Sequence, residues 1–382
     1  MSFDTNANKR FSATYKISSN SYNEAKDIAF ATALEQTVEC PYSLIENTRI
    51  ENTLLGNVES LEKISDNCFL ATISYDSSIC ESECVGLLNT LFGNTSLKSN
   101  IRLEDISLTN EMYKIYKGPK FGREGIRKLC NIQNGPIFMS AIKPVGYNVN
   151  ELQNLVYKLA KGGCTIIKDD HNLINQSYAP FKERVKACVD ALQRANRETG
   201  LNCIYVSNIS ADANEFEERA FLSQEMGVDA VMASAGLVGF PAIKKLAFDK
   251  KFNKPIFMHP ALTGAWTLSD SCGISPYCYY GKLTRIMGAD AVIFASYGGR
   301  FGFTKETCIS IKKGTETEIG NMKKAFPIPS GGMKWQNFND MVNTYGDDTI
   351  FLIGGALLTH GKDLCESTKF YVQKLNEASK NK

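Results

Sequence analysis

The sequence predicts a small α+β domain followed by a closed (β/α)8 barrel, and three observations support this prediction. The chain has 382 residues, which exceeds one typical domain and leaves room for a barrel of roughly 250 residues. After Gly135-Pro136, eight short apolar segments alternate with mostly helical segments. Lysines, carboxylates, histidines and glycine pairs directly follow several of these segments, at the strand ends where a β/α barrel carries its chemistry.

The residues before this series predict the smaller domain. Alternation of apolar and polar residues predicts strands, and apolar residues at helical spacing predict helices. Strands are expected over residues 11–17, 69–75 and 101–108, and helices over residues 25–35 and 82–91. This order is typical of a ferredoxin-like fold with an antiparallel sheet. We therefore assign residues 1–130 to an N-terminal ferredoxin-like α+β domain and residues 131–382 to the barrel.

The barrel strands are predicted from short runs of apolar and β-branched residues, the pattern of strands that are buried on both faces. They are expected over residues 137–142, 164–167, 203–207, 230–233, 255–258, 291–295, 326–329 and 350–353. Helical material lies between most of them, for example over residues 152–161. Eight βα units in series predict a closed parallel TIM barrel with its active site at the carboxyl ends of the strands.

Composition and charge limit the classes of partner. The chain is 43% hydrophobic and 22% charged, which is typical of a globular protein, and its net charge of +2 indicates neither nucleic acid nor an acidic membrane as a partner. Residues 1–10 are polar, so we expect no signal peptide, and no apolar run is long enough for a membrane span. The 12 cysteines are mostly isolated in apolar contexts, which indicates reduced thiols and a cytoplasmic protein.

Lys168, Asp170 and His171 form the most informative cluster, because they directly follow the apolar stretch that is expected to be the second barrel strand. Residues two apart on a strand share one face, so Lys168 and Asp170 are expected to point the same way. A turn after the strand can bring His171 to the same point. The cluster could hold a metal ion, especially if Lys168 reacts with CO2 to form a carbamate, which is an anionic oxygen ligand.

Other predicted strands also end in side chains that suit catalysis or binding. The first strand ends at Lys143, the fifth ends at His259, and the loop after the sixth carries Arg300. His171 and His259 are two of the three histidines of the chain, and their place at strand ends favours a functional role. Arg300 suits a phosphate or carboxylate because its guanidinium is forked and always charged, although an exposed arginine on a glycine-rich loop is an equal alternative.

Two glycine pairs follow the seventh and eighth predicted strands, Ser330-Gly331-Gly332 and Gly354-Gly355. These two loops of a β/α barrel commonly bind a phosphate through backbone N–H groups, and glycine lets the backbone approach the ligand. Two tight turns are the alternative explanation. We expect a phosphorylated small molecule as the substrate, with His259 near its phosphate or near a neighbouring oxygen.

These residues, in this order, resemble the large chain of RuBisCO, and more closely the RuBisCO-like proteins. The resemblance extends from about residue 29 to about residue 362. Its motifs are Ala33–Glu39, Phe92–Asn94, Ile142–Pro144, Gly162–Gly163 with Lys168–Asp170, Pro329–Gly332, and Gly346–Asp348 leading to Gly354–Gly355. Together these motifs are highly specific, although none of them is specific alone.

The resemblance implies an obligate homodimer in which the N-terminal domain of one subunit completes the barrel mouth of the other, with Glu35 and Asn94 acting across the interface. It also implies a carbamylated Lys168 that binds Mg2+ together with Asp170. The remaining metal ligand in the family is a glutamate, and this chain has His171 there. Because imidazole is a softer ligand than carboxylate, we expect weaker Mg2+ binding and better tolerance of Mn2+, Fe2+ or Zn2+. A site without metal is the alternative.

Several departures from the family argue against CO2 fixation. Val145 replaces a second lysine of the carboxylases, and Pro260 and Thr263 replace an arginine and a histidine. The segment around Lys120 resembles the RuBisCO-like enolases of methionine salvage, in which the matching lysine is the general base. A lysine becomes a base when burial lowers its pKa toward neutrality. A solvated lysine in a linker is the alternative for Lys120.

We therefore expect a RuBisCO-like enzyme that forms an enolate of a phosphorylated ketose or keto sugar acid, with Lys120 or Lys143 as the acid/base group. The reaction is expected to be an isomerisation, a tautomerisation (enolase reaction) or a decarboxylation of a carbohydrate phosphate, and the sequence does not choose among them. The alternative is a phosphosugar-binding RuBisCO homologue that has lost metal-dependent catalysis, and the presence of His171 is its main support.

Overall fold

The computed structural model describes residues 9–380. Residues 1–8, on which the expectation about a signal peptide mainly falls, and residues 381–382 lie outside the described residues. Contacts divide the chain into two compact units. The first comprises residues up to 117 with the returning segments Thr263–Leu283 and Ile319–Asn321, and the second comprises Gly118–Leu262, Thr284–Glu318 and Met322–Lys382. Within residues 9–380, no helix combines the length and the apolar character that a membrane span requires.

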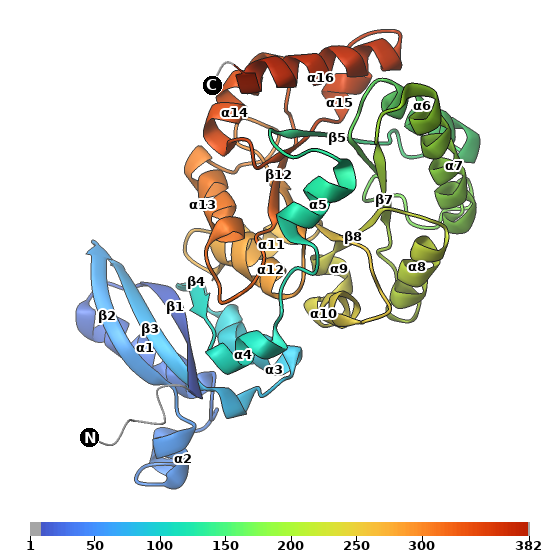
Figure 1. Cartoon of the computed structure of the whole chain (residues 1–382). Helices are drawn as coiled ribbons and strands as arrows, with labels where there is room; N and C mark the ends of the chain where they lie inside the picture. The colour runs from blue at the N-terminus through green and yellow to red at the C-terminus, as the bar shows by residue number, and fades with distance from the viewer. Residues whose placement is uncertain (1–8, 381–382) are drawn as a thin grey trace. The chain divides into compact units, whose positions relative to one another are not determined.

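The first unit is built on a five-stranded sheet in the order β10-β4-β1-β3-β2 (Figure 1). Its strands are β1 (Arg10–Ser18), β2 (Asn57–Ser65), β3 (Cys68–Asp76), β4 (Ile101–Ser107) and β10 (Gly273–Ile274). Its helices are α1 (Tyr22–Glu35), α2 (Arg49–Thr53), α3 (Cys84–Phe92), α4 (Asn110–Ile115) and α11 (Gly264–Thr267), followed by a π-helical segment, Tyr277–Leu283. Alternate residues of β1, from Phe11 to Ile17, are buried, so one face of this strand forms the core of the unit.

The predicted strands and helices of this unit are present, and the structure adds two strands that were not predicted. Strand β2 lies at one edge of the sheet, and most of its residues are exposed, so it lacks the apolar alternation that marks a half-buried strand. Strand β10 comes from a distant part of the chain and pairs parallel with β4 through only two residues. Neither strand carries a local hydrophobic signal, which explains why the sequence did not reveal them.

The second unit contains the closed parallel barrel, in the order β11-β12-β13-β5-β6-β7-β8-β9 (Figure 1). The strands are β5 (Ile137–Ala141), β6 (Ile166–Lys168), β7 (Ile204–Asn208), β8 (Ala230–Ser234), β9 (Ile256–His259), β11 (Ala291–Ala295), β12 (Phe326–Ser330) and β13 (Ile350–Leu352). All eight overlap the predicted strands, so the predicted (β/α)8 barrel is confirmed. Alternate inward-facing residues such as Met139, Val206 and Ile293 fill its interior, as is typical of this fold.

Helices surround the barrel and close its amino end. They are α5 (Gly122–Cys130), α6 (Val149–Lys161), α7 (Phe181–Thr199), α8 (Ala213–Glu225), α9 (Ala235–Val238), α10 (Phe240–Phe248), α12 (Thr284–Ile286), α13 (Lys305–Glu316), α14 (Phe338–Tyr345), α15 (Gly355–Leu358) and α16 (Leu364–Lys380). Ile126 and Cys130 of α5 belong to the same hydrophobic cluster as the barrel interior. The division between the units therefore falls at 117/118, before α5, and differs from the expected boundary at 130/131.

A single buried carboxylate ties α5 to the barrel. Asp290 precedes β11 and is 1% exposed. One of its oxygens accepts hydrogen bonds from the backbone N–H groups of Phe121 and Gly122, both at 2.7 Å, and the other accepts from Ile256 N at 2.8 Å. The partners lie at the starts of α5 and β9, so this contact fixes the entry of α5 at the amino ends of the barrel strands.

We expect Asp290→Ala to lower the free energy of unfolding by about 3 kcal/mol or more, because it leaves two buried backbone donors and one partly buried backbone donor without an acceptor. Urea unfolding with an unchanged m-value measures this loss. Asp249→Ala is the matched control, since it removes a more exposed aspartate that accepts a single backbone hydrogen bond, from Lys251 N. Equal losses in both variants would contradict the role given to Asp290.

Candidate active site

Lys168 is the last residue of β6, and its side chain is held inside the barrel. Its backbone lies between Ala141 of β5 and Val206 of β7 in the parallel ladder. The residue is only 2% exposed, and its Nζ donates a hydrogen bond to the carbonyl oxygen of Asp169 at 2.8 Å. Burial lowers the pKa of Lys168 to about 8, while nearby Asp170 raises it and Lys143 lowers it further. A large fraction of this amine is therefore neutral near pH 8.

Asp170 connects the cluster through both of its oxygens. Oδ1 accepts a hydrogen bond from Asn172 N at 3.0 Å and lies 3.2 Å from His171 Nδ1. Oδ2 lies 2.5 Å from Lys143 Nζ and forms an ion pair with it. Burial raises the pKa of Asp170, but the contacts with Lys143, Asn172 and Lys168 outweigh this effect, so the pKa lies below its usual range. Asp170 is therefore a carboxylate at neutral pH.

His171 and His259 lie face to face. Their ring centroids are 4.4 Å apart, and the ring planes differ by 13°. His259 Nδ1 accepts a hydrogen bond from Ala261 N at 3.2 Å, which assigns the ring proton to Nε2. Burial lowers the pKa of both imidazoles below the usual value, and the nearby lysines lower that of His259 further. Both rings are therefore neutral at pH 7 and present nitrogen atoms to the barrel mouth.

The predicted phosphate-binding glycines lie at the carboxyl ends of β12 and β13. Gly331 and Gly332 have φ values of +86° and +103°, which favour glycine. A Cβ on Gly299, in the loop after β11, would lie 1.8 Å from Gly331 O, so the two loops are in close backbone contact. A Cβ on Gly354 would lie 3.8 Å from Lys143 Cε, so this glycine lies beside the lysine that pairs with Asp170.

Ser330 and Arg300 lie beside these glycines. Ser330 Oγ donates a hydrogen bond to Phe294 O at 3.0 Å, and Ser296 N donates to Ser330 O at 2.7 Å. The backbone N of Arg300 lies 3.4 Å from Gly331 O, and its guanidinium lies over the Phe301 ring at 5.3 Å. Arg300 is exposed, so its side chain is free to reach an anion near the Gly331 loop.

Lys120 lies at the opposite end of the barrel, which corrects the expectation that it could act as the acid/base group. Its Nζ donates hydrogen bonds to the carbonyl oxygens of Asp249 and Phe252. These carbonyls precede β9, whereas His259 ends it. A group at the amino ends of the strands cannot exchange a proton with a substrate at the carboxyl ends. The local motif around Lys120 resembles that of the enolases. However, the path of the chain into α5 places the Lys120 side chain at the amino ends of the strands.

Glu35 and Asn94 lie together within the first unit. Asn94 Nδ2 donates hydrogen bonds to Glu35 Oε1 at 2.9 Å and to Glu39 Oε1 at 3.1 Å. The buried side chain of Gln36 supports this arrangement, because it bonds to Asn89 O and Thr90 O and accepts from Thr95 N. Glu35 and Asn94 were predicted as site residues from the resemblance to the RuBisCO family. The hydrogen bond between Asn94 and Glu39 depends on the tertiary structure and was not predicted.

The donor atoms fit a divalent cation only if Lys168 becomes a carbamate. Within residues 9–380, no three or more histidine, cysteine, aspartate or glutamate side chains are grouped so that they could hold a metal ion. Asp170 and His171 supply one carboxylate and one imidazole, which is too little for Mg2+. Asp170 Oδ2 is buried, and its partner is Lys143 Nζ at 2.5 Å, so this oxygen can bind a cation only if Lys143 moves away from it. A carbamate on Lys168 would add a second anionic oxygen donor.

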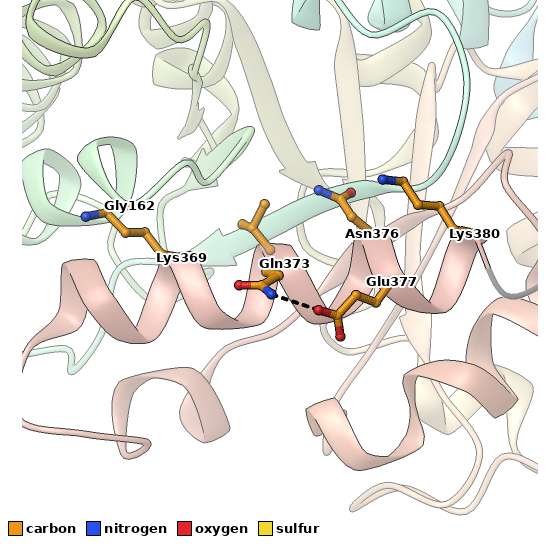
Figure 2. Close-up of a pocket in the computed structure, with 7 residues that line it drawn as sticks. Gly162, Lys369, Gln373, Asn376, Glu377 and Lys380 are labelled. Carbon is orange, nitrogen blue, oxygen red and sulfur yellow. Dashed lines mark hydrogen bonds between the residues drawn. The ribbon is translucent and has the colours of Figure 1, made fainter.

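A surface cavity on the second unit lies away from this cluster. It has a volume of about 440 Å³ and is lined by Gly162 and by residues of α16, all of them polar except Val372 (Figure 2). Helix α16 also contacts the amino ends of the strands, where Ser379 Oγ lies 3.3 Å from Asp347 Oδ1, just before β13. The cavity contains none of the residues at the barrel mouth, and its lysines are exposed side chains on one helix. We therefore do not assign it to the site.

Comparisons with known proteins agree with the fold. Residues 123–369 match the family described as the ribulose bisphosphate carboxylase large chain, catalytic domain. The chain is 33% identical over 365 residues to a 5-methylthioribulose-1-phosphate isomerase of Rhodospirillum rubrum, covering 95% of each chain. It is 32% identical to a 2,3-diketo-5-methylthiopentyl-1-phosphate enolase of Geobacillus thermodenitrificans, over 76% of this chain and 71% of the relative. A crystal structure of a Rubisco-like protein from Rhodopseudomonas palustris superposes with a TM-score of 0.87 at 30% identity, covering 97% and 98% of the two chains.

Proposed function

Because the chain belongs to the RuBisCO large-chain family and is a RuBisCO-like enzyme, we propose that it enolises a phosphorylated ketose or keto sugar acid and does not fix CO2. The observation that carries this proposal is the ion pair between Lys143 Nζ and Asp170 Oδ2, beside the buried Lys168. Two amines and one carboxylate at the carboxyl ends of β5 and β6 can transfer a proton and stabilise an oxyanion within one small space.

Lys143 is the proposed acid/base group. Nζ first releases to solvent the proton that it carries in the ion pair with Asp170, and the neutral amine then accepts the proton of the carbon next to the substrate carbonyl. The C–H electron pair then forms the C=C bond, and the carbonyl π pair moves to oxygen. Asp170 faces Lys143 Nζ and stabilises the ammonium that results. Return of the proton from Lys143 to the former carbonyl carbon, with transfer of the neighbouring hydroxyl proton to the former carbonyl oxygen, would complete an isomerisation. Its return to the enolate oxygen would complete a tautomerisation.

The other groups at the barrel mouth bind and orient the substrate in this proposal. The backbone N–H groups of Gly331, Gly332, Gly354 and Gly355 would bind the phosphate, with Ser330 and Arg300 beside them. His259 would donate its Nε2–H to a substrate oxygen. Carbamylated Lys168, Asp170 and His171 would hold a divalent cation, which supplies Lewis-acid stabilisation of the enolate oxygen when bound.

We also propose a homodimer in which Glu35 and Asn94 of each subunit serve the site of the other. Asn94 is exposed, and Leu97, on the same short segment, is 86% exposed. An exposed leucine beside a preformed carboxylate–amide cluster fits a surface that is covered on assembly. Analytical ultracentrifugation tests the dimer, and Leu97→Glu is expected to shift it toward monomer. A wild-type protein that stays monomeric at micromolar concentration would contradict this assembly.

Solvent exchange tests the proposed reaction. The protein is incubated with bicarbonate and Mn2+ in D2O together with either 5-methylthioribulose 1-phosphate or 2,3-diketo-5-methylthiopentyl 1-phosphate. Deuterium in the recovered substrate or product, detected by NMR, is the expected result with at least one of them. Ribulose bisphosphate with labelled CO2 is the control, and it is expected to give no labelled acid. Carboxylation, or no exchange with any phosphorylated ketose or keto sugar acid tested, would contradict the proposal.

His171→Glu is expected to raise the affinity for Mg2+ about tenfold or more in bicarbonate-treated protein, because it restores a hard oxygen ligand. The wild-type protein is expected to prefer Mn2+, which tolerates a nitrogen ligand better. Competition of Mg2+ with Mn2+, followed by electron paramagnetic resonance, measures both affinities. His360→Glu introduces the same carboxylate next to Phe370, whose ring His360 stacks on, and serves as the control. Equal Mg2+ affinities of the wild-type protein and the His171 variant would contradict this ligand role.

A further inference from the structure

The segment that carries Asp170 and His171 has almost no regular secondary structure. Between β6 and α7, the chain from Asp169 to Pro180 contains only turns and one isolated bridge, Gln176 to Ala179. Backbone hydrogen bonds of a helix or sheet therefore cannot hold His171 in place. His171 therefore keeps its position beside Asp170 and His259 only if side chains from neighbouring elements hold the segment.

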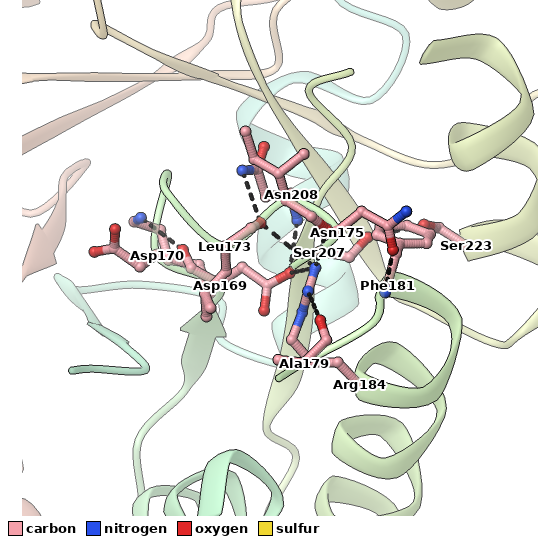
Figure 3. A network of polar contacts seen from close by, with 12 residues as sticks. Asp169, Asp170, Leu173, Asn175, Ala179, Phe181, Arg184, Ser207, Asn208 and Ser223 are labelled. Atoms are coloured by element: carbon pink, nitrogen blue, oxygen red, sulfur yellow. Dashed lines mark hydrogen bonds and ion pairs between the residues drawn. The ribbon is translucent and has the colours of Figure 1, made fainter. Parts of the chain in front are cut away.

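One set of such side chains surrounds Asp169, which faces away from the barrel mouth. Its carboxylate accepts hydrogen bonds from Tyr205 OH at 2.5 Å and from Asn208 N at 3.0 Å, and it pairs with Arg184 at 3.3 Å. Figure 3 shows Arg184 of α7 and Asn208 of β7 meeting this carboxylate. Arg184 also donates to the carbonyl oxygens of Leu173, Ile174 and Ala179. This network fixes the start and the end of the segment.

Asn208 makes the contact closest to His171. It is the last residue of β7 and is fully buried. Its Nδ2 donates hydrogen bonds to the carbonyl oxygens of His171 at 2.8 Å and of Leu173 at 3.1 Å. Its Oδ1 accepts from Ser210 N at 3.1 Å. One amide proton therefore holds the carbonyl of His171 and the other holds the carbonyl of Leu173, while the side-chain oxygen fixes the orientation of the amide itself.

We propose that Asn208 is a positioning residue, which holds the backbone of His171 so that the ring stacks on His259 and Nδ1 faces Asp170. The inference rests on the proposed function, because it assigns the position of His171 to that reaction. The side-chain amide of Asn208 forms hydrogen bonds only with backbone atoms of the protein. Its effect on the reaction therefore passes through His171. Arg184 supports the same segment, but its removal would leave the buried Asp169 unpaired and is expected to unfold the barrel.

Asn208→Asp is the informative variant. It keeps the size and the Oδ1 acceptor but replaces the donor group by an oxygen, which then faces two carbonyl oxygens. Asn208→Ser is the second variant, because its shorter hydroxyl cannot bridge both carbonyls. Ser207→Ala is the matched control. Ser207 precedes Asn208 on β7, is equally buried, and bonds to Ser223 of α8 at 3.0 Å instead of to the segment.

Crystal structures and kinetics of these variants test the proposal. We expect loss of the stacking between His171 and His259 in the Asn208 variants and its retention in Ser207→Ala. With 5-methylthioribulose 1-phosphate in D2O, kcat for exchange is expected to fall about tenfold or more in the Asn208 variants with less than about threefold change in KM, because the phosphate-binding glycines are untouched. Ser207→Ala is expected to keep kcat within about twofold of the wild-type value, even if its thermal stability falls as much as that of the Asn208 variants.

Retained stacking in Asn208→Asp and Asn208→Ser would overturn the proposal. Losses of kcat equal to that of Ser207→Ala would also overturn it, because Asn208 would then act only through stability. If the wild-type protein exchanges no proton with either methylthio sugar phosphate, the proposed function is in doubt while the inference about Asn208 is not. In that case, the presence or absence of the histidine stack in the crystal structures still decides whether Asn208 positions His171.

Discussion

Lys143→Met is expected to lower the rate of proton exchange at the substrate carbon by about 10³-fold, since it removes the proposed acid/base group and keeps the length of the side chain. The loss should appear in kcat with a small change in KM, because the phosphate-binding loops are unaffected. NMR detection of deuterium incorporation measures it. Lys186→Met, which removes an exposed lysine of α7, is the control. A Lys143 variant with more than one tenth of the wild-type rate would contradict the assignment.

Lys143→Arg separates proton transfer from charge. Arginine can keep the ion pair with Asp170 but does not release its proton at neutral pH. We therefore expect Lys143→Arg to fold as well as the wild-type protein and to remain as inactive as Lys143→Met. Activity in the arginine variant would mean that Lys143 serves only as a positive charge, and the proton would then need another acceptor.

In the presence of bicarbonate and a divalent cation, Lys168→Ala is expected to lower the exchange rate by about 10³-fold. Alanine has no amine that could react with CO2, so the variant cannot form the carbamate. Titration of Mn2+ in the presence of bicarbonate, followed by the exchange rate, measures the effect. Asp170→Asn is a useful comparison, since it keeps Lys168 but removes the neighbouring carboxylate. If Lys168→Ala retains full metal-dependent activity, the carbamate has no role.

The pH dependence of activation follows from the same residue. CO2 reacts with the neutral amine, and burial lowers the pKa of Lys168 to about 8 from its usual 10.5. The neutral fraction therefore rises about tenfold per pH unit below pH 8 and levels off above it. Preincubation with a fixed concentration of CO2 at pH 6, 7, 8 and 9, followed by assay at one pH, should show activation that increases up to about pH 8. Activation that falls over this range would contradict carbamate formation.

The barrel could be predicted from the sequence because each of its strands is a short, mostly apolar run, and helical segments separate most of these runs. Ile137–Ala141 and Ala291–Ala295 are fully apolar or small, and they pair with their predicted neighbours in a closed sheet. In contrast, β2 carries Glu59, Glu62 and Lys63 on an exposed edge, where no burial requires apolar residues. Edge strands of this kind commonly carry charges that discourage further pairing, so they lack the pattern used to detect strands.

Part of the site could be predicted because some of its residues directly follow strands that the sequence revealed. Lys168, Asp170 and His171 stand directly after a buried strand, and the parallel ladder places such residues at one end of the barrel. Lys120 was assigned from a local motif, and its position depends on how the chain enters α5, which no local pattern determines. The roles of Asn208 and Gln36 depend on hydrogen bonds to residues more than 30 positions away, so spacing alone does not reveal them.

A crystal structure of the Lys143→Met variant with bicarbonate, Mn2+ and 5-methylthioribulose 1-phosphate would test the account most directly, because the blocked reaction keeps the substrate in place. We predict the phosphate at the backbone N–H groups of Gly331, Gly332, Gly354 and Gly355. We also predict a carbamate on Lys168 and the carbon that loses its proton facing the side chain of residue 143. A substrate bound away from the carboxyl ends of the strands, or with its carbonyl far from residues 143 and 168, would contradict the account.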